Sequence, residues 1–349
     1  MIERSKHIPS KTVGEMKITL KELIRLYTLK NHKPCSTFMW GGPGIGKSAI
    51  VRQAVEELGM DPEESFIDQR LQQIDPVDLR GLPRINDAGS FEYCPPEFLP
   101  TEGRGVLFLD ELNLAPQQVQ AAAYELVFDR KLGSGYRLPD GWMVIAAGNR
   151  SGDRAFVNPM SSPLANRFIH WQVVPDLDDW KEWAYEEGIN SDIIGFLNYR
   201  HDMLYRFDPE RSGHAFPTPR TWERVSDLME LGMDKQEDIA SAVGMGAAAE
   251  FVAFLNVREE LPDVEKILEG EFEVPREPDV LNATISSIID KAKNRPELAE
   301  NVVGFANEIS DPLAEFSVVM VKDAIKAGIP VQQTSEYKDF VADRGDLIL

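Results

Sequence analysis

The chain has 349 residues, 43% of them hydrophobic, which is enough for two or three domains with a sizeable core. Its 58 acidic and 37 basic residues give a net charge of −21, and without a dense run of Lys and Arg such a surface repels nucleic acids and anionic membranes. Two cysteines cannot build a disulfide framework, and no stretch approaches roughly 18 uninterrupted apolar residues. We therefore expect a cytoplasmic protein without a membrane span.

The first predicted elements surround a glycine-rich loop. Apolar residues at helical spacing predict a helix over 17–31, and 35–40 has the composition of a strand. Residues 41–48 read GGPGIGKS and fit the phosphate-loop pattern G-x-x-x-x-G-K-[ST], and a helix is predicted over 48–59. Strand, loop and helix in this order are what the motif needs. The alternative is a glycine-rich turn that binds no ligand.

The residue types in this loop suit a polyphosphate. Glycines let the backbone N–H groups point inward, and the N-terminus of the following helix favours anions. The Lys47 ammonium can reach the β and γ phosphates, and the Ser48 hydroxyl can ligate Mg²⁺. The predicted nucleotide contacts in this segment are Gly42, Pro43, Gly44, Ile45, Gly46, Lys47, Ser48 and Ala49.

The next elements alternate between strands and helices. Residues 70–101 are rich in Pro, Gly and Asp, and 82–93 predicts a hairpin that turns at 86–89. Beyond it we predict buried strands over 105–109, 142–147 and 168–174. A helix is predicted over 116–130 and a second, short hairpin over 132–139. This alternation predicts an α/β domain with a mostly parallel sheet over 1–175.

The strand pattern stops after residue 175. We predict a helical domain over 176–270, interrupted near Gly213 and 217–219, and a helical C-terminal extension over 271–349. An acidic, proline-containing linker over 268–279 separates them. Within the extension the helical pattern covers 280–328, and the last dozen residues are polar.

Three polar side chains follow buried strands, at the sheet edge where α/β proteins bind ligands. Asp110 can hold the Mg²⁺ shell, and Glu111 can polarise an attacking water; the alternative is an acidic helix cap. Asn149 can orient the water or contact the γ phosphate, or it is a turn asparagine.

Two arginines are placed to meet charge on a transferring phosphoryl group. Arg167 opens the last predicted strand, and Arg220 opens a helix of the second domain. The alternative for each is an ordinary solvated surface residue.

The ordered set GGPGIGKS, VLFLDE, AAGN, ANRF and TPRT resembles an AAA+ ATPase over roughly residues 15–265. The phrases RLPDGW and PLANRF are similar to the MoxR-type and dynein-related branch. The resemblance implies a P-loop NTPase αβα sandwich over 1–175, an all-α lid over 176–270, and ATP with Mg²⁺ as cofactors. The hairpins at 82–93 and 132–139 would be the helix-2 insert and the insert before sensor 1.

The resemblance also assigns a role to each candidate position. Lys47 and Ser48 would be the Walker A lysine and Mg²⁺ hydroxyl, and Asp110 and Glu111 the Walker B metal carboxylate and catalytic glutamate. The resemblance also implies that Asn149 is sensor 1, Arg167 the arginine finger and Arg220 the sensor 2 arginine. Many relatives have Thr in place of Ser48, and either hydroxyl binds Mg²⁺. Arg150 and Arg154 lie close enough in sequence to compete for the finger role.

A finger that acts in trans implies a homo-oligomeric ring, a hexamer by resemblance. The function implied is MgATP-driven remodelling or maturation of a partner protein, typically one with a von Willebrand factor A domain. Phe91 and Tyr93 of the first hairpin would contact this client, or be buried. One alternative is a nucleic-acid motor or loader, against which the charge of −21 argues. The others are a nucleotide-binding scaffold and a small kinase or GTPase, although no Asn-Lys-x-Asp guanine signature is present.

Overall fold

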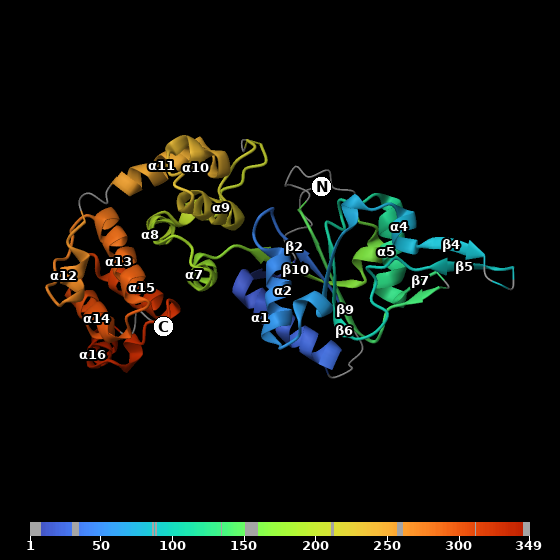
Figure 1. The fold of residues 1–349 in the computed structure, drawn as a ribbon, viewed down its shortest axis with the longest axis horizontal. Helices are drawn as coiled ribbons and strands as arrows, with labels where there is room; N and C mark the ends of the chain where they lie inside the picture. The colour runs from blue at the N-terminus through green and yellow to red at the C-terminus, as the bar shows by residue number, and fades with distance from the viewer. Residues whose placement is uncertain are drawn as a thin grey trace. The chain divides into compact units, whose positions relative to one another are not determined.

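The computed structural model describes residues 8–29, 35–85, 87, 89–133, 135–150, 160–210, 213–256, 261–310 and 312–344. The chain divides into two compact units (Figure 1). The first combines Met1–Pro175 with Asp208–Arg211, and the second combines Asp176–Phe207 with Ser212–Leu349.

A six-stranded sheet forms the centre of the first unit, with the strand order β1-β10-β2-β9-β6-β3 and every pairing parallel. The strands are β1 (Ser10–Thr12), β2 (Ser36–Trp40), β3 (Phe66–Arg70), β6 (Arg104–Asp110), β9 (Gly141–Gly148) and β10 (Phe168–Val174). The inner strands β2, β6 and β9 are buried on both faces, which explains their continuous apolar runs. The predicted α/β class with a parallel sheet is confirmed.

Helices cover both faces of this sheet (Figure 1). The helices of the first unit are α1 (Val13–Ile24), α2 (Lys47–Glu57), α3 (Pro62–Ser65), α4 (Pro76–Arg80), α5 (Gln117–Asp129) and α6 (Ser162–Ala165). On one face α5 packs its apolar side against Phe38, Leu107 and Val144. On the other, α1 and α2 lie against each other over the sheet. The result is a three-layer αβα arrangement.

Two short hairpins extend the first unit: β4 (Leu82–Ile85) with β5 (Phe91–Cys94), and β7 (Lys131–Leu132) with β8 (Tyr136–Arg137). Of the predicted turn at 86–89, only residues 87 and 89 are described. A Cβ on Gly135 would lie 2.4 Å from the Tyr93 carbonyl oxygen, so the two hairpins are close neighbours. Arg130 closes the second one, because its Nη2 donates to the carbonyls of Pro139 and Trp142 at 2.6 and 2.8 Å.

The first unit also contains elements that the sequence pattern did not predict. β1 and β3 are the two edge strands, and β3 is at most half-buried, with three polar residues in succession, Asp68, Gln69 and Arg70. The predicted helix at 17–31 starts earlier, at Val13, because Thr12 forms a capping box with Glu15. It ends at Ile24 and passes into a π-helical turn over Arg25–Leu29; residues 30–31 lie outside the described part.

Among its described residues, the second unit contains helices and no strand. Its helices are α7 (Leu177–Glu186), α8 (Ser191–Tyr199), α9 (Pro219–Glu230), α10 (Gln236–Val243), α11 (Met245–Asn256), α12 (Val264–Leu268), α13 (Pro278–Ala292), α14 (Ala299–Glu308), α15 (Ala314–Lys326) and α16 (Ser335–Arg344). One apolar cluster surrounds Trp222 and Phe251, and another surrounds Ile288 and Phe305. α16 was not predicted; its sequence is polar, but Phe340 is fully buried.

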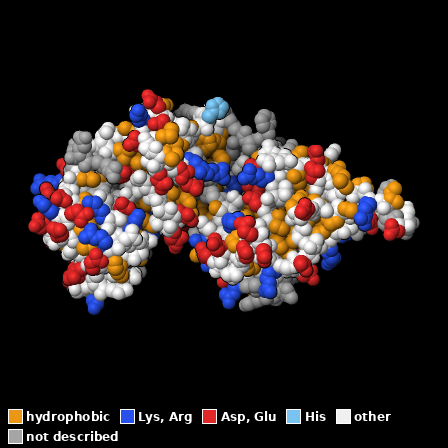
Figure 2. All heavy atoms as spheres, in the orientation of Figure 1, with side chains coloured by type: hydrophobic (Ala, Val, Ile, Leu, Met, Phe, Trp, Pro, Cys, Tyr) orange, Lys and Arg blue, Asp and Glu red, His pale blue; other side chains and the backbone are white. Residues whose placement is uncertain are grey.

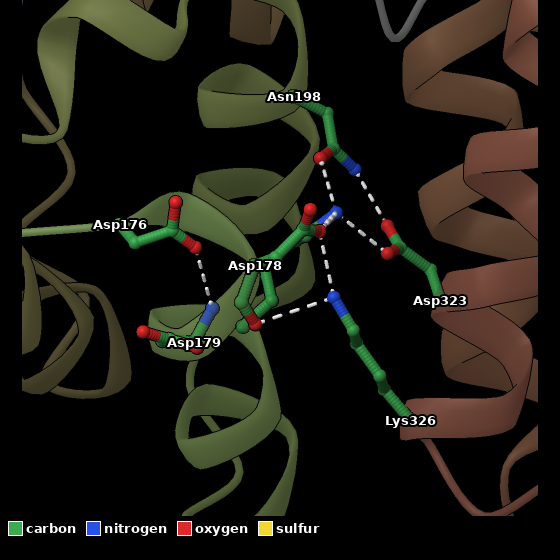
Figure 3. Close-up of polar contacts among 7 residues, drawn as sticks. Asp176, Asp178, Asp179, Asn198, Asp323 and Lys326 are labelled. Carbon is green, nitrogen blue, oxygen red and sulfur yellow. Dashed lines mark hydrogen bonds and ion pairs between the residues drawn. The ribbon is translucent and has the colours of Figure 1, made fainter. Parts of the chain in front are cut away.

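A buried polar network ties the early helices of this unit to α15 (Figure 3). The Lys181 ammonium is 2.6 Å from an Asp323 oxygen and donates to Asn198 Oδ1 at 3.0 Å. Asn198 in turn donates to the second Asp323 oxygen at 2.8 Å. Burial above all raises the pKa of Tyr185 well above its ordinary value. The negative charge of Asp323 and a hydrogen bond to that carboxylate act in the same direction. Among the described residues, no helix is both long and apolar enough to cross a membrane.

Candidate active site

The register of the sheet brings the candidate residues to one edge. Trp40 at the end of β2 pairs with Gly148 of β9, and Leu109 of β6 pairs with Ala146 of the same strand. The Gly41 amide continues the contact by donating to the Gly148 carbonyl at 3.2 Å. Because parallel strands share their carboxyl edge, the glycine-rich loop, Asp110 and Asn149 leave the sheet side by side.

The loop backbone has the shape that its glycines allow. Gly44 and Gly46 have φ values of 74° and 91°, in the left-handed region that side chains rarely adopt. Gly46 is also the N-cap of α2, and no side chain in the described part of the chain caps that helix start. The first N–H groups of α2 are therefore directed at the loop, where an anion would accept from them.

Lys47 lies over the loop. Its ammonium donates to the carbonyl oxygens of Gly41 and Gly42, both at 2.9 Å, and reaches Asn149 Oδ1 at 3.5 Å. The structure thus brings two predicted site residues, Lys47 and Asn149, into contact although they are far apart in the sequence. Ser48 and Ala49 follow in the first turn of α2.

The pair Asp110 and Glu111 forms a tight turn after β6. Glu111 has φ 56°, and among the described residues only one other non-glycine, Arg130, has a positive φ. The Glu111 amide donates to Asp110 Oδ1 at 2.9 Å, and the Leu112 amide is anchored on the Ala147 carbonyl at 3.1 Å. A strained residue held by its surroundings at a sheet edge is a common feature of functional sites.

Asn113 supports this turn and was missed by the sequence reasoning. It is fully buried, and its Nδ2 donates to the Asn149 carbonyl at 2.7 Å. A Cβ on Gly148 would lie 2.0 Å from Asn113 Oδ1, so only glycine fits opposite it. The only signal in the sequence was a single amide between Leu112 and Leu114.

Asp68 of β3 is a third carboxylate near Asp110 and Glu111. Although its side chain reaches solvent, partial loss of hydration and the negative charge of Asp110 raise its pKa; Arg70 opposes this and Glu111 adds to it. Crowded negative charge of this kind favours a cation at the edge. The described residues contain no ready-made cluster of three His, Cys, Asp or Glu ligands.

Arg167 is oriented toward α5 rather than toward the loop. Its Nη2 donates to the Tyr124 hydroxyl at 2.8 Å, and its guanidinium carbon lies 3.3 Å from the centroid of the Phe128 ring. The structure therefore does not bring Arg167 together with Lys47 or Glu111 of the same chain.

The remaining arginines are placed as follows. Arg220 is exposed in the first turn of α9, where Thr218 caps the helix. It belongs to the second unit, and its role stays a prediction. Arg150 is half-buried next to Asn149, and Arg154 lies outside the described residues.

A glycine-rich loop that opens a helix, at the carboxyl edge of a parallel sheet and beside an Asp–Glu pair, defines a P-loop nucleoside triphosphatase. Residues 36–168 match the family described as AAA domain, dynein-related subfamily. These residues form an AAA domain of this subfamily, so the chain contains an ATPase domain.

The other comparisons give distant matches. No curated protein sequence matches the chain. A RuvB variant from Thermotoga maritima is 18% identical, with a TM-score of 0.40, over 75% of this chain and 79% of that one. NtrX from Brucella abortus in complex with ATP is 15% identical, with a TM-score of 0.41, over 86% of this chain and 66% of that one. The assignment rests on the family match and the motifs.

Proposed function

We propose that this AAA+ ATPase hydrolyses MgATP to remodel or mature a partner protein, as a MoxR-like chaperone. The observation that carries the catalytic part is the contact of Lys47 with both the loop carbonyls and Asn149, beside the Asp110–Glu111 turn. A nucleotide in the loop would give the ammonium phosphate oxygens in place of these carbonyls.

Each residue at the edge has a proposed role. The amides of the loop and Lys47 bind the phosphates, Glu111 polarises the attacking water, and Asn149 orients that water or the γ phosphate. The Ser48 hydroxyl and the Asp110 carboxylate are oxygen donors of the kind that Mg²⁺ takes, with phosphate and water completing its shell. Bound there, the ion would neutralise charge that develops on the phosphates.

We also propose that the chain assembles into a homo-oligomeric ring, a hexamer, in which Arg167 completes the site of the neighbouring subunit. Its contacts with α5 and not with its own loop support this role. In the same proposal 1–175 binds the nucleotide, 176–270 is the lid that carries Arg220 as sensor 2, and 271–349 is a helical extension.

The proposed partner is a cytoplasmic protein with a von Willebrand factor A domain. The hairpin β4–β5 would be the helix-2 insert that contacts the client; Leu82, Ile85 and Tyr93 on it are 66%, 67% and 43% exposed. Tyr93 is thus not buried, and the side chain of Phe91 lies outside the described part. The hairpin β7–β8 would be the insert before sensor 1. Acidic and basic side chains are interspersed on the visible surface of the first unit, which supports a protein partner more than a nucleic acid (Figure 2).

Affinity capture from the native host tests the proposal. Glu111→Gln should bind MgATP without turning it over and should retain a protein with a von Willebrand factor A domain. Lys47→Ala, which cannot hold the nucleotide, is the matched control and should retain less of it. Recovery of nucleic acid alone, released as the salt concentration rises, would instead support a nucleic-acid motor.

A further inference from the structure

Among the described residues, two aromatic side chains and no acid hold Arg167. Its Nη2 donates to the Tyr124 hydroxyl at 2.8 Å, and its guanidinium carbon lies 3.3 Å from the centroid of Phe128 and 5.4 Å from that of Tyr124. Tyr124 and Phe128 are four residues apart on α5, so they share one helix face, and their ring centroids are 6.4 Å apart. Together they form a seat for the guanidinium.

This seat orients the cation without neutralising it. An aromatic face attracts a guanidinium through its quadrupole, whereas a carboxylate would cancel its charge and would have to be displaced before a phosphate could bind. No carboxylate among the described residues forms an ion pair with Arg167, and its buried Nε has no hydrogen-bond partner in that part of the chain. The positive charge of Arg167 therefore remains available for a phosphate.

Phe128 has little structural reason to be aromatic. It is 51% exposed near the C-terminal end of α5, so it buries only part of its apolar surface. Among the described residues, the ring contacts of Phe128 are with Arg167 and Tyr124.

We propose that Tyr124 and Phe128 are positioning residues, which present the charged Arg167 guanidinium to the triphosphate bound by a neighbouring subunit. This inference rests on the proposed role of Arg167 in trans. An arginine that is already ordered loses less rotational freedom when it meets the phosphate, so the seat raises turnover and not nucleotide affinity.

Mixed assemblies test the inference, because they separate the subunit that binds ATP from the one that lends the arginine. The acceptor is Arg167→Ala, with an intact loop and no finger. The donor is Glu111→Gln, with a dead site and an intact finger. Each is inactive alone in this proposal, and turnover by the mixture reports the donated arginine.

Changes at the seat are then made in the donor only. Phe128→Leu keeps an apolar side chain without an aromatic face, and we expect it to lower kcat of the mixture about threefold to tenfold while KM for ATP is kept. Phe128→Tyr keeps the face and should restore turnover. Tyr124→Phe removes the hydrogen bond and should lower kcat less than Phe128→Leu does. Gln118→Ala, at an exposed position of the same helix, is the matched control.

The outcomes separate this inference from the proposed function. If the Phe128→Leu donor supports turnover as well as the donor with Phe128, the seat has no positioning role, although Arg167 acts in trans. If Phe128→Leu donors fail to enter the mixed assembly, by light scattering, the aromatic face serves docking and the inference is also wrong. If donors with an unaltered seat do not restore turnover to Arg167→Ala, the trans role of Arg167 itself fails.

Discussion

The indole N–H of Trp40 donates to Nδ1 of His170 at 3.0 Å, and Nε2 of His170 lies 2.8 Å from the Ala165 carbonyl. Because an indole nitrogen only donates, His170 accepts at Nδ1 and carries its proton on Nε2, as a neutral imidazole. Trp40 directly precedes the phosphate loop, and Ala165 lies two residues before Arg167. One side chain therefore links the strand that leads to the loop with the segment that carries the proposed finger.

Replacing His170 tests this link. His170→Phe keeps a planar ring but leaves the Trp40 N–H and the Ala165 carbonyl without partners, and we expect a loss of about 1–3 kcal/mol in the free energy of unfolding. His170→Gln, which offers an acceptor and a donor on one side chain, should lose less. Urea unfolding measures both, and equal losses would show that the two hydrogen bonds contribute nothing.

The catalytic assignments predict that two substitutions have opposite effects on nucleotide binding. Lys47→Ala should abolish nucleotide binding, measured by calorimetry, because the phosphates lose their cation. Glu111→Gln should preserve binding and reduce turnover about 10²- to 10⁴-fold, the range for losing a general base. Glu56→Gln, an exposed carboxylate on α2, is the control and should turn over ATP normally. Normal turnover by Glu111→Gln would refute its catalytic role.

The close packing of Gly148 against Asn113 predicts that a single methyl group added at Gly148 destabilises the fold. Gly148→Ala places a Cβ 2.0 Å from Asn113 Oδ1 and 2.9 Å from the Phe38 ring, so the turn must move. We expect a destabilisation of about 1–3 kcal/mol and weaker turnover, because Asn149 is displaced. Gly246→Ala in α11 meets no atom within 4 Å and should leave stability unchanged or raise it. Similar behaviour of the two variants would contradict the close packing at Gly148.

Lys181 and Asp323 form a buried ion pair, and we expect its disruption to lower the free energy of unfolding strongly. Their side chains are 4% and 0% exposed, so Lys181→Met leaves a buried carboxylate without its counter-ion. We expect a loss of about 3–5 kcal/mol in unfolding free energy. The double variant Lys181→Met with Asp323→Leu removes both charges and should be more stable than Lys181→Met alone. A double variant that is no better would mean that the pair is not electrostatically coupled.

The lowered pKa of Asp178 predicts that the fold loses stability in acid. Burial opposes its ionisation, but the hydrogen bond from Lys326 at 2.6 Å and the charge of Lys181 outweigh this and lower its pKa to about 2. Since the unfolded value is about 3.9, the pair stabilises the fold above that pH, and its contribution disappears as the pH falls toward 2. The Asp178 side chain is 66% exposed, so we expect only about 0.2–1 kcal/mol.

The measurement for Asp178 compares the wild type with Asp178→Asn by urea unfolding at about pH 5 and about pH 3. The difference between the two proteins should shrink at the lower pH. A difference that does not change with pH would contradict the lowered pKa.

Much of the first unit could be predicted from apolar runs. β6 and β9 contain continuous apolar runs, and β2 and β10 are apolar at most positions, so all four strands could be recognised; their shared carboxyl edge follows from the α/β pattern. The edge strand β3 has only two apolar residues followed by three polar ones, and it resembles a loop in sequence. α16 owes its place to the burial of Phe340 in a tertiary contact, which its polar composition does not reveal.

Residues of the candidate site could be predicted only where a motif requires a particular residue type at a particular spacing. The loop glycines and Lys47 are recognisable from their spacing. Asn113 and Asp68 are not, because their importance depends on which strands are neighbours and on how closely Gly148 approaches. The contact of Arg167 with Phe128 depends on the turn after α6, which local sequence does not define.

The parallel sheet also constrains the order in which the protein can be made. β2, the strand that feeds the phosphate loop, has β10 and β9 as its neighbours, and both come much later in the chain. Pairings of such long sequence separation form slowly, since the loop between them must close first. During synthesis the strand before the nucleotide loop has no neighbour until β9 has left the ribosome, and it has only one until β10 follows. Until then apolar strands are exposed, and this is the stage at which aggregation competes with folding.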